Sequence, residues 1–360
     1  MSQWRMRVQV LALVAFLVAC GGAAPTATTQ LPQASATAAR ASSAPSAASG
    51  SAAASVAPAG SAAPGATPTR AAAPATPAVA GTPGATVYPL TIADDAGRSV
   101  TVPKRPVRIV SLAPSNTEIL YALGLADRVV GVDQFSNYPP EAQSKPKIGS
   151  YSAANLEQVV AREPDLILAS GITRPDVLNA LSAQGLPVVV LNPSNLTGVL
   201  ANVTLVGRVT DVGAGAGQLR AGLEARIAAV AEKLKGTNTK PRAFVELDPM
   251  QFFSVGPKSF VDDLITRAGG VNIAADTGTP YPQLSQEQIL GKDPEVILLA
   301  DGSQGVTPAS VQGRAGWGNV SAVKSGRIVV LDEDVFLRSG PRSVDALEML
   351  LRYLHPELFR

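Results

Sequence analysis

The feature that most restricts the fold is an alternation of short β-branched runs with helical stretches over about 270 C-terminal residues. The runs are apolar throughout, which is typical of parallel strands covered by helices on both faces. A segment of this length exceeds what one hydrophobic core usually supports, so two lobes are expected. A hairpin over 88–102 is predicted by the turn Asp94-Asp95-Ala96-Gly97. The expected strands are 108–112, 128–132, 165–169 and 187–191 in the first half, and 242–247, 295–299 and 327–331 in the second.

The two halves also contain a repeat. Residues 155–168 align with 285–298 without a gap: a capping residue, Glu-Gln, two apolar residues, a charged pair, Pro and then a strand recur in order. This repeat favours two lobes of similar topology. Between the halves, 212–235 lacks proline and places apolar residues on one helical face, which predicts a connecting helix of roughly 35 Å. The residues of that face are Leu219, Leu223, Ile227, Val230 and Leu234.

The first 20 residues have the features of a secretory signal, because two arginines precede an apolar stretch too short to span a bilayer. Leu17-Val18-Ala19-Cys20 resembles a bacterial lipobox, in which the cysteine is acylated after cleavage. The alternative is ordinary cleavage beside an incidental Cys20. Residues 21–86 are dominated by Ala, Pro, Ser, Thr and Gly, and predict a disordered tether. The expected organisation is a signal peptide (1–20), a tether (21–86), an N-terminal lobe (87–211), a connecting helix (212–236) and a C-terminal lobe (237–360).

Charge and composition exclude several functions. The formal net charge of +2 comes from Arg5 and Arg7 of the signal, since the rest of the chain has 28 basic and 28 acidic residues. A neutral chain lacks the electrostatic footprint of a nucleic-acid-binding protein. One Cys and one His exclude internal disulfides and Cys- or His-rich metal sites. His355 precedes Pro356, as expected of a helix-end residue. Nucleophile elbows and phosphate loops are absent from the sequence, so we expect no catalytic residue, no metal and no cofactor.

Aromatic residues stand out in segments that follow strands or precede helices, where the open ends of α/β sheets form a crevice. Aromatic side chains with a few polar groups suit a large, partly apolar ligand. The alternative is that each aromatic covers the edge of a local core. The loop aromatics are Tyr138, Tyr151, Phe252, Phe253, Tyr281 and Phe336.

Four segments together resemble ABC-transporter substrate-binding proteins of the vitamin B12, haem and iron-siderophore branch, and most of all its cobalamin-binding members. They are 108–118 (RIVSLAPSNTE), 137–140 (NYPP), 155–157 (NLE) with 164–166 (PDL), and 281–287 (YPQLSQE). The resemblance covers about residues 88–357. It implies an α/β fold with two Rossmann-like lobes, parallel sheets, one long connecting helix and a ligand cleft between the lobes.

The resemblance also implies a set of ligand contacts. Its aromatics would pack on a corrin ring, while Asp334 and Arg338 would hydrogen-bond the amide side chains of the ring. The implied contacts are Tyr138, Tyr151, Phe253, Tyr281, Asp334, Phe336 and Arg338. Trp317 is expected either near the rim of the cleft or packed under a loop.

Glu157 and Glu287 occupy matched places in the repeat, just inside helices that Asn155 and Ser285 are expected to cap. They could simply compensate the helix dipoles. The resemblance instead implies that one Glu from each lobe docks on an arginine pocket of a dimeric permease. Ser115 with Glu118 matches a third capping box, for which a structural role is expected.

These expectations describe a lipid-anchored, extracytoplasmic solute-binding protein, a monomer without enzymatic activity that delivers a corrinoid such as cobalamin to the permease dimer of an ABC importer. Acylated Cys20 would anchor it at the outer face of the cytoplasmic membrane or in the periplasm. The alternative within the fold is a ferric-siderophore or haem binder, with a tyrosine as haem ligand. A surface-anchored hydrolase or adhesion module is the alternative from another class, and a signalling partner would keep the fold without the cleft aromatics.

Overall fold

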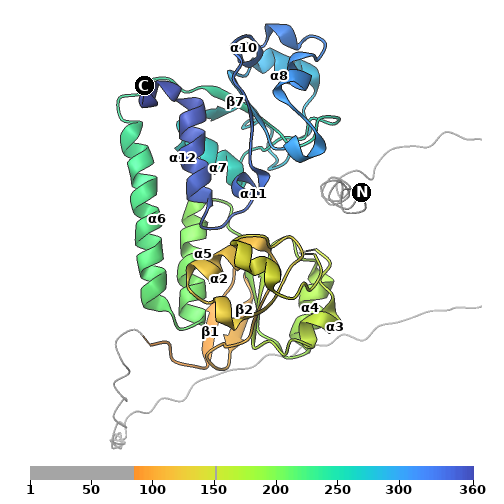
Figure 1. Cartoon of the computed structure of the whole chain (residues 1–360), viewed down its shortest axis with the longest axis vertical. Helices are drawn as coiled ribbons and strands as arrows, with labels where there is room; N and C mark the ends of the chain where they lie inside the picture. The colour runs from red at the N-terminus through yellow and green to blue at the C-terminus, as the bar shows by residue number, and fades with distance from the viewer. Residues whose placement is uncertain (1–84, 151) are drawn as a thin grey trace, which may run out of the picture. The chain divides into compact units, whose positions relative to one another are not determined.

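The computed structural model describes residues 85–150 and 152–360 (Figure 1). The predicted signal peptide, Cys20, most of the tether and Tyr151 lie outside the described residues. Thr86, the last residue of the predicted tether, is bonded to the folded part. Its backbone N–H donates to Asp211 (2.8 Å) and its hydroxyl to the Arg208 carbonyl (2.8 Å).

The predicted hairpin is confirmed as β1 (Leu90–Ala93) and β2 (Ser99–Val102), which pair antiparallel. Asp94 organises its turn, accepting hydrogen bonds from the Ala96 and Arg98 N–H groups and pairing with the Arg98 guanidinium at 2.7 Å. The same carboxylate accepts the Val190 N–H (3.1 Å), so the hairpin is fastened to the first lobe.

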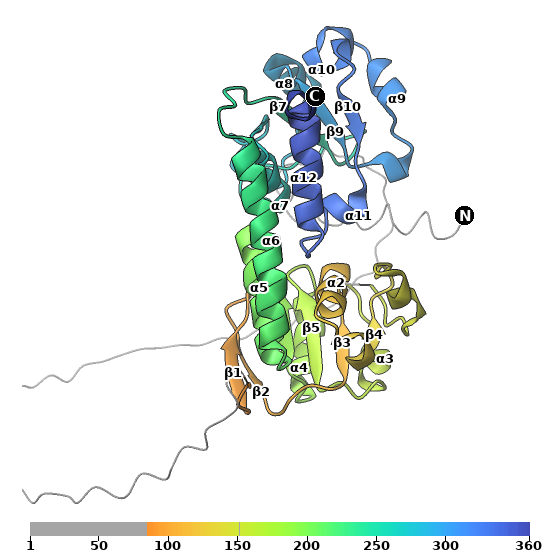
Figure 2. The same ribbon diagram turned by 60° about the vertical axis from the view of Figure 1, so that its left-hand side comes forward.

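All seven predicted buried strands are found, and together with one unpredicted short strand they form two four-stranded parallel sheets (Figure 2). The first has the order β4-β3-β5-β6, with β3 (Ile109–Ser111), β4 (Val129–Val132), β5 (Leu166–Ser170) and β6 (Val188–Leu191). Its helices are α2 (Pro114–Ala122), α3 (Leu156–Val160), α4 (Pro175–Ala183) and α5 (Leu196–Val209), with 3-10 turns η1 (Ala126–Arg128) and η2 (Pro140–Ser144).

The second sheet has the order β8-β7-β9-β10, with β7 (Arg242–Glu246), β8 (Val271–Asn272), β9 (Val296–Leu299) and β10 (Ile328–Val330). Its helices are α7 (Phe260–Arg267), α8 (Gln286–Lys292), α9 (Pro308–Gln312), α10 (Ser321–Lys324), α11 (Glu333–Phe336) and α12 (Ser343–Leu354). The 3-10 turns are η3 (Gly302–Gln304), η4 (Trp317–Asn319) and η5 (Pro356–Phe359). Strand for strand, the two orders match, as the repeat predicted.

The predicted connecting helix is α6 (Gly213–Lys233), which packs against α5 of the first lobe and α12 of the second (Figures 1 and 2). The α5–α6 contact is close because Gly207 has no side chain: a Cβ there would lie 2.2 Å from the Cβ of Ala216. On the other side, Arg226 pairs with Asp345 (2.6 Å) and Glu348 (2.8 Å) of α12. Salt bridges therefore fix α6 to the second lobe, and tight packing fixes it to the first.

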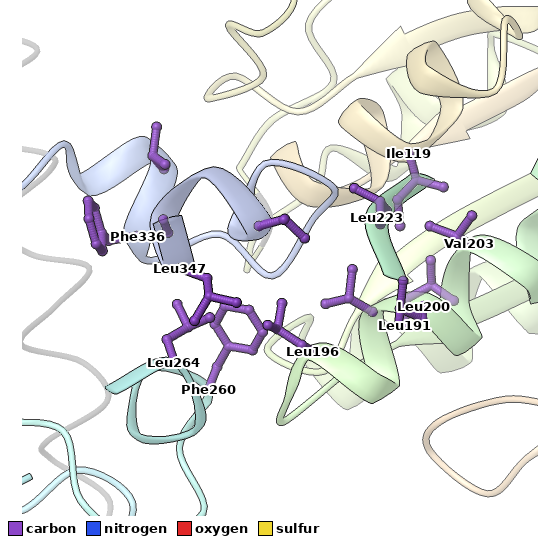
Figure 3. Packing of buried hydrophobic residues seen from close by; sticks show 14 of the residues in the cluster. Ile119, Leu191, Leu196, Leu200, Val203, Leu223, Phe260, Leu264, Phe336 and Leu347 are labelled. Carbon is purple, nitrogen blue, oxygen red and sulfur yellow. The ribbon is translucent and has the colours of Figure 1, made fainter. Parts of the chain in front are cut away.

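One hydrophobic cluster continues from the first lobe through α6 into the second. Figure 3 shows Leu200 and Leu223 on one side of this cluster, and Leu264 and Leu347 on the other, with Leu196 beside the Phe260 ring between them. A shared core of this kind resists independent movement of the lobes. Within the described residues, every helix falls short of the length and apolar character that crossing a membrane requires.

Candidate functional site

Two loops from opposite lobes meet at their polar tips. The loop after β4 carries Asn137 and Tyr138, and the segment from α11 to the start of α12 carries Asp334 and Arg338. Asp332 sets the start of α11, because its side chain accepts the Asp334 N–H. Both loops follow the carboxyl ends of parallel strands, where α/β sheets bind ligands.

Asp334 and Arg338, one helical turn apart, form a pair that we call the amide clamp. Arg338 Nη2 lies 2.5 Å from Asp334 Oδ1. Asn137 bonds both partners, donating from Nδ2 to Asp334 Oδ2 (2.6 Å) and accepting at Oδ1 from Arg338 Nη1 (2.6 Å). The clamp thus bonds both the NH₂ group and the carbonyl oxygen of the Asn137 carboxamide, which comes from the opposite lobe.

Glu118 lies behind the clamp and corrects one prediction. Helix α2 has Ala113 as its N-cap, without a side-chain cap, so the expected Ser115–Glu118 capping box is wrong. Glu118 is buried and instead contacts the second lobe, with Oε1 at 2.6 Å from Arg342 and 3.6 Å from Arg338. Burial raises the pKa of Glu118, and the two arginines oppose that increase. Sequence reasoning missed this contact, which spans more than 200 residues of chain.

The loop bearing Asn137 is held from below by Asp133, which is buried at the end of β4. Its carboxylate accepts the Ser136 hydroxyl and the Phe135 N–H (2.8 Å). Lys147 Nζ donates to the Ser136 carbonyl at 2.8 Å. Burial raises the pKa of Asp133, and the hydrogen bonds from Ser136 and Phe135 offset only part of that increase. The backbone next to Asn137 is thus positioned without help from the Asn137 side chain.

The predicted aromatic contacts fall into different environments. Tyr138 is 43% exposed, and the Arg342 guanidinium lies 4.0 Å from its ring centroid. Tyr281 is 53% exposed. Phe253 is partly buried against the core and pairs with Gln283, which brings its segment beside that of Tyr281. The structure therefore places Tyr138 beside the amide clamp, and Phe253 and Tyr281 together in the second lobe.

Phe336 does not contribute to an exposed binding surface, so the prediction that it contacts the ligand is wrong. It is fully buried in the shared core and stacks on Tyr353, with ring centroids 6.5 Å apart. The last residue of α11 faces the core because α11 packs against α12. Phe336 supports the helix that presents Asp334 and offers no surface to a ligand.

Trp317 packs under a loop, the second of the two alternatives considered for it. It is fully buried against Phe244 and Phe252, which also assigns the loop aromatic Phe252 to a core edge. Arg314 lies over the Trp317 ring (4.8 Å) and forms a two-bond ion pair with Glu246 at 2.5 and 2.7 Å. This cluster at the end of β7 was not predicted, because no local pattern links its members.

Asp301, just after β9, adds a second carboxylate to that cluster. Both its oxygens are buried without a hydrogen-bond donor. Burial, followed by the negative charge of Glu246, raises the pKa of Asp301 to about 8. Burial and the charge of Glu246 thus favour the protonated form of Asp301, which can donate a hydrogen bond to Glu246.

Glu157 and Glu287 are exposed in the first turns of α3 and α8. The expected caps are confirmed: the Asn155 side chain accepts the Gln158 N–H (3.1 Å), and Ser285 with Gln288 forms a capping box. A groove of about 470 Å³ between α3 and α4 borders Glu157 and is lined mainly by apolar side chains such as Leu156, Val160 and Ala180.

His355 is the helix-end residue that the sequence predicted. It is the C-cap of α12, and its two ring nitrogens lie 3.1 Å from Glu357 and 3.3 Å from the Gly269 carbonyl. Over residues 85–150 and 152–360, three or more His, Cys, Asp or Glu side chains nowhere gather in a way that could hold a metal ion.

Two sheets of equal strand order, a rigid helix between them and polar loops that meet across the lobes define a two-lobed α/β binding protein. The chain belongs to the periplasmic binding protein family, whose model matches residues 109–335. It is similar to an uncharacterized ABC transporter substrate-binding lipoprotein, YvrC, of Bacillus subtilis (33% identity, covering 76% of this chain and 88% of that one). A cobalamin-binding protein of Halobacterium salinarum is 32% identical, with 75% of each chain covered.

Among solved structures, the periplasmic haem-binding protein RhuT from Roseiflexus sp. RS-1 is similar, with a TM-score of 0.64 and 29% identity over 70% of this chain and 98% of that one. The protein described here is thus a substrate-binding protein of an ABC importer, in a family that includes cobalamin and haem binders. Proteins of this family act in transport and are extracytoplasmic.

Proposed function

We propose that this protein captures a corrinoid, cobalamin or a close relative, between its two lobes and delivers it to the permease of an ABC importer. The observation that carries this proposal is the amide clamp, which bonds both the nitrogen and the oxygen of the Asn137 carboxamide at 2.6 Å. The rim of a corrin ring bears acetamide and propionamide side chains, which offer the same donor and acceptor.

The charge of the clamp favours carboxamides over carboxylates. Asp334 can only accept hydrogen bonds when ionised, so it suits an amide N–H and repels a second carboxylate. A haem presents two propionates, and of the two clamp residues only Arg338 could bond to them. Hydrogen bonds to charged groups contribute about 1.5–3 kcal/mol, enough to distinguish the two ligand classes.

Exposed aromatic rings complete the site. Tyr138 and Tyr281 offer ring faces to a flat macrocycle, with Phe253 beside Tyr281. We include Tyr151 in this site on the resemblance alone. The ligand needs no protein-bound cofactor or metal in this proposal.

Delivery would use Glu157 and Glu287 as paired contacts on a permease dimer. Both are exposed at equivalent places in lobes of equal strand order, which suits a partner built of two equivalent subunits. The apolar groove beside Glu157 adds contact area of the kind found at protein interfaces. Acylation of Cys20 would keep a monomer near the membrane.

Titration of the full chain in detergent, by calorimetry with cyanocobalamin, haemin and a ferric siderophore, tests this proposal. We expect cyanocobalamin to bind with a dissociation constant in the micromolar range or below, and haemin at least about tenfold more weakly. Failure of cyanocobalamin to bind at micromolar concentrations would exclude the corrinoid proposal.

Haem is the second candidate, favoured by the two exposed tyrosine phenols and the similarity to RhuT. If haem were the ligand, Tyr138→Phe and Tyr281→Phe would change the visible spectrum of bound haemin by removing an axial oxygen. An unchanged spectrum would remove tyrosine ligation as an explanation.

A further inference from the structure

The amide clamp is occupied by the protein itself. Asn137 comes from the first lobe, whereas Asp334 and Arg338 come from the second. The orientation of the Asn137 amide is fixed by charge, because the reverse orientation would direct its NH₂ group at the Arg338 guanidinium. A ligand carboxamide that uses both members of the clamp must therefore replace the Asn137 side chain.

The surroundings allow this replacement. The Asp334 side chain is 43% exposed, so solvent reaches one side of the clamp. The backbone at Asn137 keeps other supports when its side chain leaves: Gln143 Nε2 donates to the Asn137 carbonyl (3.2 Å), and Lys147 holds the adjacent Ser136 carbonyl.

The remaining contacts between the lobes are independent of Asn137. Glu118 pairs with Arg342 at 2.6 Å, and Arg338 Nη2 donates to the Phe135 carbonyl at 3.2 Å. Loss of the Asn137 contact therefore leaves Arg338 oriented and the lobes in register. The clamp can exchange one carboxamide for another without being rebuilt.

We propose that Asn137 is an internal competitor, whose side-chain carboxamide occupies the Asp334–Arg338 clamp in the ligand-free protein and is displaced by a carboxamide of the ligand. This proposal rests on the proposed corrinoid function. Asn137 thereby lowers the affinity for carboxamide ligands and bonds the Asp334 and Arg338 atoms that their own ion pair leaves free. Displacement releases a bond between the lobes at the moment of capture.

The central experiment compares wild type, Asn137→Ala and the control Asn179→Ala in calorimetric titrations of the full chain with cyanocobalamin. Asn179 is an exposed asparagine of α4 in the same lobe. We expect Asn137→Ala to bind about tenfold more tightly, which corresponds to about 1.4 kcal/mol, and the control to match wild type. Unchanged affinity would overturn the proposal, and weaker binding would show instead that Asn137 is a ligand contact.

A second probe tests the chemical class. Cobyrinic acid keeps the corrin ring but has carboxylates in place of the amides. Asn137→Ala should improve its affinity less than twofold, because a carboxylate cannot donate to Asp334. An equal improvement for both corrinoids would contradict competition for the clamp.

A third measurement needs no ligand and separates this proposal from the corrinoid function. Thermal midpoints are compared for wild type, Asn137→Ala, Asp334→Ala and the double variant. If the Asn137–Asp334 bond is formed, the double variant loses less than the sum of the two single losses. Additive losses would overturn the occupied clamp whether or not cyanocobalamin binds. A coupled pair in a protein that binds no cyanocobalamin would refute only the corrinoid ligand.

Discussion

Buried carboxyl groups in this protein differ in the charge of their nearest neighbour. Glu118 and Glu246 each pair with arginine, at 2.6 Å and 2.5 Å. Asp301 faces Glu246, and its pKa is raised to about 8. A carboxyl group that stays protonated can donate a hydrogen bond to a neighbouring carboxylate, so the pair is held together by one proton rather than by a cation.

This proton makes stability depend on pH. The folded pKa of Asp301, about 8, lies above the value of about 3.9 expected for the unfolded chain. The folded state thus binds the extra proton, and the stabilisation falls as pH rises between these values, by up to about 1.4 kcal/mol per pH unit. Asp301→Asn keeps a donor without titrating. We expect it to be the more stable protein at pH 8 and to flatten the profile between pH 5 and 8, measured by urea unfolding.

The exposed Asp127 provides the control for that experiment. Asp127→Asn should reproduce the wild-type slope. A wild-type profile that is already flat over this range would contradict a shared proton.

Glu118 tests the opposite case, in which the charge is needed. Glu118→Gln leaves the mostly buried Arg342 without its counterion, whereas Arg338 keeps Asp334. Removing one member of a buried pair typically costs about 3–5 kcal/mol. Because each arginine keeps some exposure, we expect a loss of about 2–4 kcal/mol in urea unfolding. Glu157→Gln, at an exposed position, should change stability by less than about 0.5 kcal/mol. Equal effects of the two variants would show that the Glu118 pairs contribute little.

At the scale of elements, the repeat extends further than its sequence pattern. Arg108 at the start of β3 donates to the carbonyl of Glu163 (3.0 Å), and Arg242 at the start of β7 donates to that of Asp293 (2.9 Å). Glu163 and Asp293 each follow a helix, and each has a positive φ, 48° and 44° respectively. The two lobes thus close equivalent helix ends with an arginine from the neighbouring strand.

The packing of α5 on α6 gives a prediction with an internal control. Gly→Ala in a helix normally stabilises by up to about 1 kcal/mol. At Gly207 the new methyl group would overlap Ala216, whereas at Gly222 of α6 it would meet no atom within 4 Å. We expect Gly207→Ala to destabilise by about 1–3 kcal/mol and Gly222→Ala to stabilise, both measured by urea unfolding. A stabilising Gly207→Ala would mean that the helices move apart freely.

The elements that sequence reasoning found are those with local signals. Apolar β-branched runs located seven of the eight strands in the two parallel sheets, but β8 has only two residues and is defined by its pairing with β7. The site was predictable only in part. Tyr138, Asp334 and Arg338 matched family motifs, whereas Glu118 and Asn137 act through partners about 200 residues away. Phe336 shares the motif but faces the core, a distinction set by tertiary packing.

At the scale of the whole molecule, matched lobes predict a matched partner. We expect Glu157→Ala with Glu287→Ala to reduce cyanocobalamin uptake by cells more than tenfold while the dissociation constant stays within twofold. Both side chains are exposed in the first turn of a helix, so they can present their charge to the permease. The dissociation constant should stay unchanged because neither side chain supports the core. Uptake assays in a strain lacking the wild-type protein provide the measurement.

The control pair is Glu224→Ala with Glu232→Ala, which removes two exposed charges from α6. Uptake should then match wild type. Normal uptake by the Glu157/Glu287 variant would refute docking through these residues, and weakened ligand binding would reassign them.

The hydrophobic cluster that runs through α6 has a consequence for how the chain folds. Each sheet has a smaller core of its own, around Ile167 in the first lobe and Phe244 in the second. The largest cluster, however, is shared, and residues such as Leu196, Leu223 and Leu347 join the two lobes in it. Denaturation should therefore be a single cooperative event in which tryptophan fluorescence and circular dichroism change together. Two separated transitions would mean that a lobe can survive alone. A half-length chain with one sheet would expose this apolar surface, and it could remain soluble only by pairing with another half.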